Sequence, residues 1–180
     1  MILIVGLGNP GKKYENNRHN VGYMFVDFYV NELTGSRVHE FRFNKTLQSE
    51  LPMVKKDGKT ILFAKPQTFM NRSGEAVKKI MDFYKIPLES VFIAHDDLDI
   101  PLGKFHIQKA VGPKLHNGIT SVEERLGTKE FTRIRIGIEN RSPEDRIPGE
   151  AYVLQNFSEE EKNTVWEIFP EITCKFHSFI

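Results

Sequence analysis

The stretch ILIVGLGNPGKKYENNRHNVGY, residues 2–23, decides how the fold begins, because an apolar run leads directly into three glycines. Residues 2 to 7 have the continuous apolar character of a buried strand. Gly6, Gly8 and Gly11 then form the pattern G-x-G-x-x-G. Almost every residue from 12 to 20 is polar, and apolar residues at helical spacing resume only at Val21. The stretch therefore predicts a strand, a polar loop over 8–20 and a helix.

The glycine pattern is shared with dinucleotide-binding loops, but its context here is different. Such a loop opens a helix at once, so that backbone N–H groups and the helix dipole face a pyrophosphate. It also needs an acidic residue at the end of a second strand, about 20 residues on. Here the glycines are followed by a polar loop, and Asp27 and Glu32 fall on the predicted helix. The sequence therefore disfavours NAD binding, which a simple titration would test.

Length and composition indicate one globular domain over residues 1–180. Hydrophobic residues make up 39% of the 180 and aromatic residues 11%, enough for a sizeable core. Apolar runs are too short to span a membrane, and the N-terminus lacks the pattern of a secretory signal. The single cysteine, Cys174, can form no internal disulfide. We therefore expect a cytoplasmic protein with no membrane partner.

Strand and helix patterns alternate along the chain. Apolar periodicity and turn residues predict a helix from Val21 capped by Asn20, a hairpin of strands 47–54 and 60–64, a helix capped by Ser73, strands at 91–94 and 104–109, a helix over 118–126 ended by Gly127, a strand over 133–138, and a last helix with a Ser158–Glu161 capping box. Arg133 and Arg135 should lie on the polar side of their strand. The predicted fold class is α/β, a single-domain three-layer α/β/α architecture with a twisted mixed β-sheet.

Candidate catalytic residues lie where predicted strands end or helices begin. His19 is the one with an ordinary pKa near neutrality, about 6.5, so it suits a general base, and Asp96 could hold its imidazole. Asn9, Asn71 and Asn117 offer neutral N–H donors for a carbonyl or an oxyanion. Turn formation explains the asparagines equally well. A base-activated water fits this set of side chains.

Other chemistries are less well supported by the sequence. Asp96, Asp97 and Asp99 could hold a hard cation such as magnesium, but no second carboxylate cluster completes the ligands. Ser73 lies outside a nucleophile elbow, and nothing near Cys174 marks an activated thiol. We therefore expect no metal and no covalent intermediate.

Positive charge is concentrated in one segment. Residues 104 to 135 contain seven Lys or Arg against three Glu, a net charge of +4 in a chain whose total is +1. A solvated face explains such an imbalance, and so does contact with a polyanion.

Six strings together resemble the bacterial-type peptidyl-tRNA hydrolase. They are VGLGNPGKKYENNRHNVG, KPQTFMNRSG, HDDLDIPLGK, HNG, RIRIGI and YVLQNF, in that order, over residues 2 to 157. The resemblance implies hydrolysis of the ester between peptide and tRNA in peptidyl-tRNA released from stalled ribosomes. It implies no cofactor, and we expect a monomer. The glycine stretch resembles the family's substrate-binding loop.

The resemblance also implies roles for individual residues. His19 matches the catalytic base, Asp96 its partner, and Asn71 a residue that holds substrate and stabilises the tetrahedral intermediate. The remaining matches are to substrate-binding positions, namely Asn9, Tyr14, Met70, His116 and Asn117, and to tRNA-binding cations, namely Lys104 and Arg135.

The chain also departs from the family pattern. The family has several glycines before its H-N-G, whereas this chain has AVGPKLHNG at 110–118. Asn17 replaces a usual Thr, and the C-terminal lid helix of the family is expected to be shortened. The alternative function is that of a non-catalytic RNA-binding relative.

Overall fold

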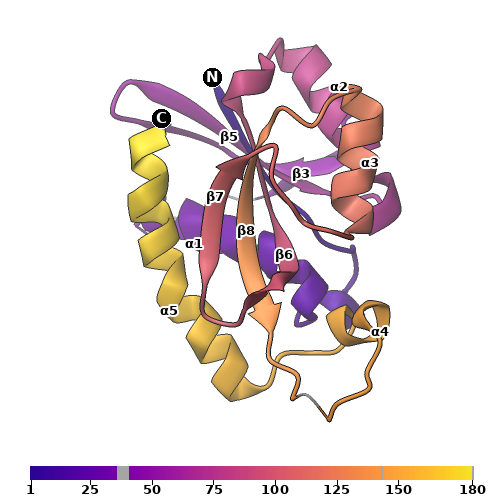
Figure 1. Cartoon of the computed structure of the whole chain (residues 1–180). Coiled ribbons are helices and arrows are strands. Elements are labelled where there is room, and N and C mark those ends of the chain that lie inside the picture. The colour runs from indigo at the N-terminus through magenta and orange to yellow at the C-terminus, as the bar shows by residue number, and fades with distance from the viewer. Residues whose placement is uncertain (36–40, 143, 180) are drawn as a thin grey trace.

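One mixed sheet organises the part of the chain that the structure, a computed structural model, describes, residues 1–35, 41–142 and 144–179. Within these ranges eight strands form the sheet in the order β2-β3-β5-β1-β6-β8-β7, with β4 also paired to β5 (Figure 1). The strands are β1 (Ile2–Gly6), β2 (Arg42–Asn44), β3 (Ser49–Leu51), β4 (Met53–Lys56), β5 (Lys59–Pro66), β6 (Val91–Pro101), β7 (Phe105–Lys109) and β8 (Thr132–Glu139). The two ends of this order do not pair, so the sheet is open.

The direction of pairing follows the chain connections. β1 runs parallel to β5 and β6, and β6 parallel to β8, each after a helical crossover. β7 is antiparallel to β8, and both β3 and β4 are antiparallel to β5. The prediction of a mixed sheet is confirmed. The prediction of one strand over 47–54 is wrong in detail, because Pro52 has no N–H for the ladder and separates β3 from β4.

Helices cover both faces of this sheet. The α-helices are α1 (Val21–Thr34), α2 (Ser73–Tyr84), α3 (Asn117–Leu126), α4 (Gly149–Val153) and α5 (Glu159–Phe176). Short 3-10 turns are η1 (Lys12–Tyr14), η2 (Arg18–Asn20), η3 (Met70–Arg72), η4 (Leu88–Ser90) and η5 (His177–Phe179). Figure 1 shows α1 and α5 on one face and α2 and α3 on the other, which confirms the predicted three layers.

The alternation of side chains along β1 divides the core in two. Ile4 packs with α1 and α5, whereas Leu3 and Val5 pack with α2 and α3. All three are fully buried, as expected for a parallel strand covered on both faces. No described helix is long and apolar enough to cross a membrane.

Close packing of two glycines brings the first helix onto the strands. A Cβ on Gly6 would collide with the carbonyl of Gly22, and a Cβ on Gly22 would lie 2.6 Å from the backbone nitrogen of Leu7 and against the carbonyl of Ala94. The start of α1 therefore lies directly on β1 and β6. This contact places η2, the turn before α1, beside the polar residues of β6.

Candidate active site

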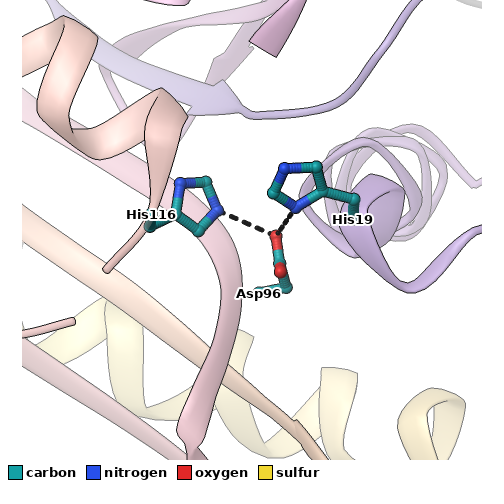
Figure 2. A group of neighbouring side chains, drawn as sticks. All are labelled: His19, Asp96 and His116. Carbon is teal, nitrogen blue, oxygen red and sulfur yellow. Dashed lines mark hydrogen bonds and ion pairs between the residues drawn. The ribbon is translucent and has the colours of Figure 1, made fainter. Parts of the chain in front are cut away.

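Asp96 lies between two imidazoles at the end of the buried part of β6. One of its oxygens, Oδ1, is 2.8 Å from Nδ1 of His19 and 2.8 Å from Nε2 of His116 (Figure 2). His19 comes from η2, and His116 is the residue that caps α3. All three are buried, with Asp96 only 1% exposed. The structure thus brings the predicted base and its predicted partner together, and it places His116, predicted as a substrate-binding residue, on the other side of Asp96.

The cap of α3 fixes the protons of this group. Nδ1 of His116 accepts hydrogen bonds from the backbone N–H groups of Gly118 and Ile119, at 3.1 and 3.2 Å. Its proton must therefore be on Nε2, which donates to Asp96. The carboxylate also accepts from Nδ1 of His19, so the neutral His19 ring keeps Nε2 unprotonated. A nitrogen in this state can accept a proton from water.

Charge and burial together lower the pKa of Asp96 and raise the pKa of His19. Burial alone would raise the pKa of Asp96, but the charges of His19 and His116 and the hydrogen bonds from both rings hold it well below 3.8. Burial also lowers the pKa of His19, but the Asp96 carboxylate more than offsets this and raises it above 6.5. The carboxylate is therefore ionised at neutral pH, and it stabilises an imidazolium at His19.

The hydrogen bonds of these residues argue against cation binding. Nε2 of His116 carries a proton as long as Nδ1 caps α3, so that nitrogen is not free to ligate a metal. The two other aspartates of the sequence cluster are also occupied, since Asp97 pairs with Arg135 and Asp99 with Lys114. The three carboxylates thus face separate partners, and the ligand atoms that do lie together, within 4.8 Å of one another, are those of His19, Asp96 and His116.

A pocket of about 400 Å³ opens onto this group. Its lining comprises His19, Asp96, Leu98, Leu115, His116, Asn117, Pro148, Gly149, Glu150 and Val153. α4 supplies one wall of the pocket and the start of α3 another. Leu115, in the loop that differs from the family pattern, is 90% exposed. That loop is attached to the end of β6, because the backbone N–H of Lys114 donates to Asp99 at 2.9 Å.

Asn9 is fixed by hydrogen bonds on both sides of its backbone and through its side chain. Its N–H donates to Oδ1 of Asn20 and its C=O accepts from Nδ2 of Asn20, both at 2.9 Å. Its own Oδ1 accepts from the backbone N–H of Met70 at 2.9 Å. The side-chain NH₂ of Asn9 is therefore its remaining donor. Asn9 lines a second hollow, beside Lys12 and Gln67, and Met70 is buried in the core.

Two predicted helix caps are wrong because 3-10 turns precede the helices. Asn20 occupies the cap position of α1, but its side chain pairs with Asn9 and does not cap the helix. Ser73 is the first residue of α2 rather than its cap, and its hydroxyl donates to the carbonyl of Met70. Turns η2 and η3 lead straight into α1 and α2. The same turns carry His19 and Asn71.

Asn71 and Asn117 are both exposed and lie on neighbouring elements. Asn71 belongs to η3, and Asn117 is the first residue of α3. The two elements touch, since a Cβ on Gly118 would lie 2.5 Å from Sδ of Met70. Within the described ranges neither asparagine side chain forms a hydrogen bond, so their amides are available to a ligand. Both roles stay predictions.

The predicted tRNA contacts lie outside the pocket and differ from each other. Lys104 is exposed on the turn between β6 and β7. Arg135 is only 7% exposed, because its guanidinium pairs with Asp97 at 2.7 Å and with Gln108 at 2.8 Å. Arg133 is also buried. Both arginines lie opposite the core isoleucines of β8, on its polar side as predicted, and ion pairs with Glu123 and Asp97 cover them there. The tRNA role of both cations stays a prediction.

Tyr14 lies in η1, in the loop over residues 8–20 that also carries His19, and it is partly buried. Its ring makes an edge contact with Phe69, with 6.4 Å between centroids, and Nζ of Lys13 lies 4.7 Å above it. Phe69 is itself 56% exposed, so the pair forms an aromatic surface between the loops that hold His19 and Asn71. A substrate contact by Tyr14 stays a prediction.

Sequence reasoning did not identify two buried neighbours of the base. His95 precedes Asp96, is fully buried, and Nδ1 of its ring lies 2.7 Å from the Asp96 carbonyl. Burial and the nearby His116 lower its pKa well below 6.5, so it stays neutral. Arg18 precedes His19 and pairs with Glu161. Its position beside His19 was the only signal in the sequence, because its partner is distant in the chain.

Comparison with known proteins gives consistent matches. The family model described as peptidyl-tRNA hydrolase matches residues 3–180. A peptidyl-tRNA hydrolase of Bdellovibrio bacteriovorus is 42% identical over 161 residues, which cover 89% of this chain and 83% of the relative. Another, from Thermoanaerobacter sp., is 44% identical over 167 residues, 93% of this chain and 86% of the relative. The crystal structure of peptidyl-tRNA hydrolase from Acinetobacter baumannii has a TM-score of 0.83 at 29% identity, covering 94% of this chain and 83% of that one.

Proposed function

The chain belongs to the peptidyl-tRNA hydrolase family, and we propose that it hydrolyses the ester between peptide and tRNA with a water activated by His19. The observation that carries this mechanism is the double hydrogen bond at Oδ1 of Asp96. It leaves Nε2 of His19 unprotonated on a ring that lines the pocket. Hydrolysis of peptidyl-tRNA itself is the activity that membership of the family supports.

In the proposed reaction His19 first accepts a proton from water and then donates it to the leaving oxygen. Nε2 takes a proton from water as the water oxygen bonds to the ester carbonyl carbon. Asp96 stabilises the resulting imidazolium, as its effect on the His19 pKa indicates. The carbonyl oxygen becomes an oxyanion, the bond to the 3′ oxygen of the tRNA breaks, and the imidazolium returns its proton to that oxygen. The carbonyl reforms as that bond breaks, so the products are a tRNA with a free hydroxyl and a peptide carboxylic acid, which releases its remaining water-derived proton to solvent and becomes a carboxylate.

The asparagines are proposed to hold the carbonyl group and its neighbours. The side chain of Asn71 is exposed on a turn attached to Asn9 through the Met70 N–H, so it presents an N–H donor from a fixed backbone. We assign it the oxyanion, and we assign Asn9 and Asn117 to the peptide and the tRNA end. Met70 is buried next to Asn71, and His116 donates a hydrogen bond to Asp96. Tyr14 contacts Phe69, which precedes this turn.

Outside the pocket we propose that Lys104 and Arg135 meet the tRNA backbone. Lys104 is exposed and free of ion pairs within the described chain, whereas Arg135 would have to share its guanidinium with Asp97. We also propose a monomer in the cytoplasm, a reducing compartment that suits the single free cysteine, Cys174.

The test is release of an N-blocked amino acid from N-blocked aminoacyl-tRNA in the presence of a chelator. His19→Ala should lower turnover by about 10²- to 10⁴-fold while tRNA affinity stays unchanged. His177→Ala, in the C-terminal turn η5, is the matched histidine control and should behave as wild type. Tight tRNA binding without hydrolysis by the wild type would instead identify a non-catalytic RNA-binding protein.

A further inference from the structure

Two sets of hydrogen bonds attach the turn that carries His19 to the start of α5. The first set joins backbone groups. The N–H of Arg18 donates to the carbonyl of Gln155 and the N–H of Phe157 donates to the carbonyl of Asn16, both at 3.0 Å. This short antiparallel bridge ties the residues just before the base to the segment that leads into α5.

The side chain of Arg18 forms the second set of hydrogen bonds. Its Nη2 donates to both carboxylate oxygens of Glu161, at 2.9 and 2.6 Å, and its Nη1 donates to the carbonyl of Asn156 at 2.8 Å. The guanidinium carbon lies 4.1 Å from the ring centre of Tyr152, on α4. Arg18 is 6% exposed and Glu161 9% exposed, so the pair is shielded from water.

Glu161 has a second partner on its own helix. Its Oε2 accepts from the backbone N–H of Ser158 at 2.8 Å, and its own N–H donates to the Ser158 hydroxyl at 3.2 Å, which completes the capping box predicted from the sequence. Its Oε1 also accepts from Asn140, just after β8, at 3.1 Å. One carboxylate thus joins the end of β8, the start of α5 and the turn before the base.

We propose that Arg18 and Glu161 are positioning residues for His19, so that the cap of α5 sets the orientation of the base toward the pocket. The proposal rests on the proposed function of His19. A buried ion pair is weak evidence for stability, because desolvation offsets most of its attraction. The two hydrogen bonds from Arg18 to the oxygens of Glu161 are directional, however. They fix the orientation of Arg18, the residue adjacent to the base. The same guanidinium stacks on α4, which forms a wall of the pocket.

Two neighbouring substitutions separate positioning from capping. Glu161→Gln keeps an acceptor for the Ser158 N–H, so the capping box survives, but it removes the charge that Arg18 requires. Ser158→Ala removes the hydroxyl of the cap and leaves the carboxylate facing Arg18. Arg133→Met is a third control, because it breaks another buried pair, to Glu123 at 2.6 Å, that does not contact the turn of the base.

The experiment measures kcat and KM on N-blocked aminoacyl-tRNA, thermal unfolding, and the NMR signal of the His19 Nδ1 proton. A misplacement of about 1 Å can cost about 10²-fold in rate, so Glu161→Gln and Arg18→Met should lower kcat by about 10- to 10²-fold at unchanged KM. Both should also speed solvent exchange of the His19 proton. Ser158→Ala and Arg133→Met should lower the melting temperature but leave kcat and the proton signal unchanged.

Two results would overturn the proposal. One is an unchanged kcat and an unchanged proton signal in Glu161→Gln and Arg18→Met. The other is a loss of kcat in all four variants that follows only their melting temperatures, which would make the pair merely structural. The proton signal is read without any substrate. If the wild type fails to hydrolyse the ester, the proposed function fails, and the exchange rates still decide whether Arg18 and Glu161 hold His19.

Discussion

Replacing Asp96 by asparagine tests the hydrogen-bond arrangement of the site most directly. The proton of His116 cannot move from Nε2 to Nδ1, because Nδ1 accepts hydrogen bonds from the N–H groups at the start of α3. Its Nε2–H therefore requires an oxygen, so the new amide must turn its oxygen toward His116. The same oxygen then faces Nδ1–H of His19, since both rings share Oδ1 in the wild type. Asp96→Asn should thus preserve the proton arrangement of His19 and remove only the negative charge.

The size of the loss follows from this argument. The variant exchanges one charge-assisted hydrogen bond to the developing imidazolium for a neutral one, which costs about 1.5–3 kcal/mol at most. At about 1.4 kcal/mol per factor of ten, kcat should fall by no more than roughly 150-fold. Loss of the correct protonated form of a catalytic histidine costs about 10⁴-fold in the serine protease triad, so the two cases differ measurably.

The pH dependence of kcat/KM gives an independent test, because the direction of its shift can be predicted. The base works only when neutral, so kcat/KM of the wild type should rise with pH through the His19 pKa, which the carboxylate holds above 6.5. In Asp96→Asn the carboxylate is gone and burial, which lowers the pKa, remains. The acid limb of the profile should therefore move to lower pH, below 6.5, while the plateau falls.

The double variant Asp96→Asn with His116→Ala completes the assay. Without the imidazole of His116 the amide is free to turn its NH₂ toward His19, which would place the His19 proton on Nε2 and block the base. Turnover on N-blocked aminoacyl-tRNA should fall well below that of Asp96→Asn alone. A loss near 10⁴-fold in the single variant, or an acid limb that stays above 6.5, would refute the reasoning.

Further predictions concern the other parts of the site. Asn71→Ala should lower kcat by about 10²-fold or more at unchanged tRNA affinity if the amide meets the oxyanion, and a normal kcat would reduce Asn71 to a turn former. Lys104→Ala should lower the salt dependence of tRNA binding by about one unit of slope, whereas Lys78→Ala, an exposed lysine of α2, should not. Gly74→Ala forces a methyl against the backbone of α3 and should destabilise the protein by about 1–3 kcal/mol in urea unfolding, and an unchanged midpoint would contradict the tight contact of α2 and α3.

The sequence was informative wherever a local pattern determines structure. The apolar run before Gly6, the Asp57–Gly58 turn and the Ser158–Glu161 box predicted elements that the structure contains. Each depends on residues close together in the chain. His19 and Asp96 could also be chosen from the sequence, because His19 comes just before a predicted helix and Asp96 just after a predicted strand.

The sequence was not informative where distant groups compensate for one another. The burial of Arg135 could not be predicted, because alternation along β8 says nothing about Asp97 on the neighbouring strand. Asn20 was expected to cap α1, but pairing with the backbone of Asn9 satisfies its amide instead. The 3-10 turns have too few residues to show a period, so the sequence did not reveal that neither predicted cap, Asn20 or Ser73, caps its helix.

The site combines a tightly held base with freely exposed amides, and this contrast suits its substrate. His19 is fixed through Asp96 on one side and through the backbone of Arg18 on the other. Proton transfer depends steeply on distance, so the group that moves the proton gains most from such restraint. Asn71 and Asn117 are exposed, and in the proposed function they would meet peptides of different sequence on different tRNAs. Rigidity at the base alone allows one chemistry to act on many substrates, because the ester is the only part they all share.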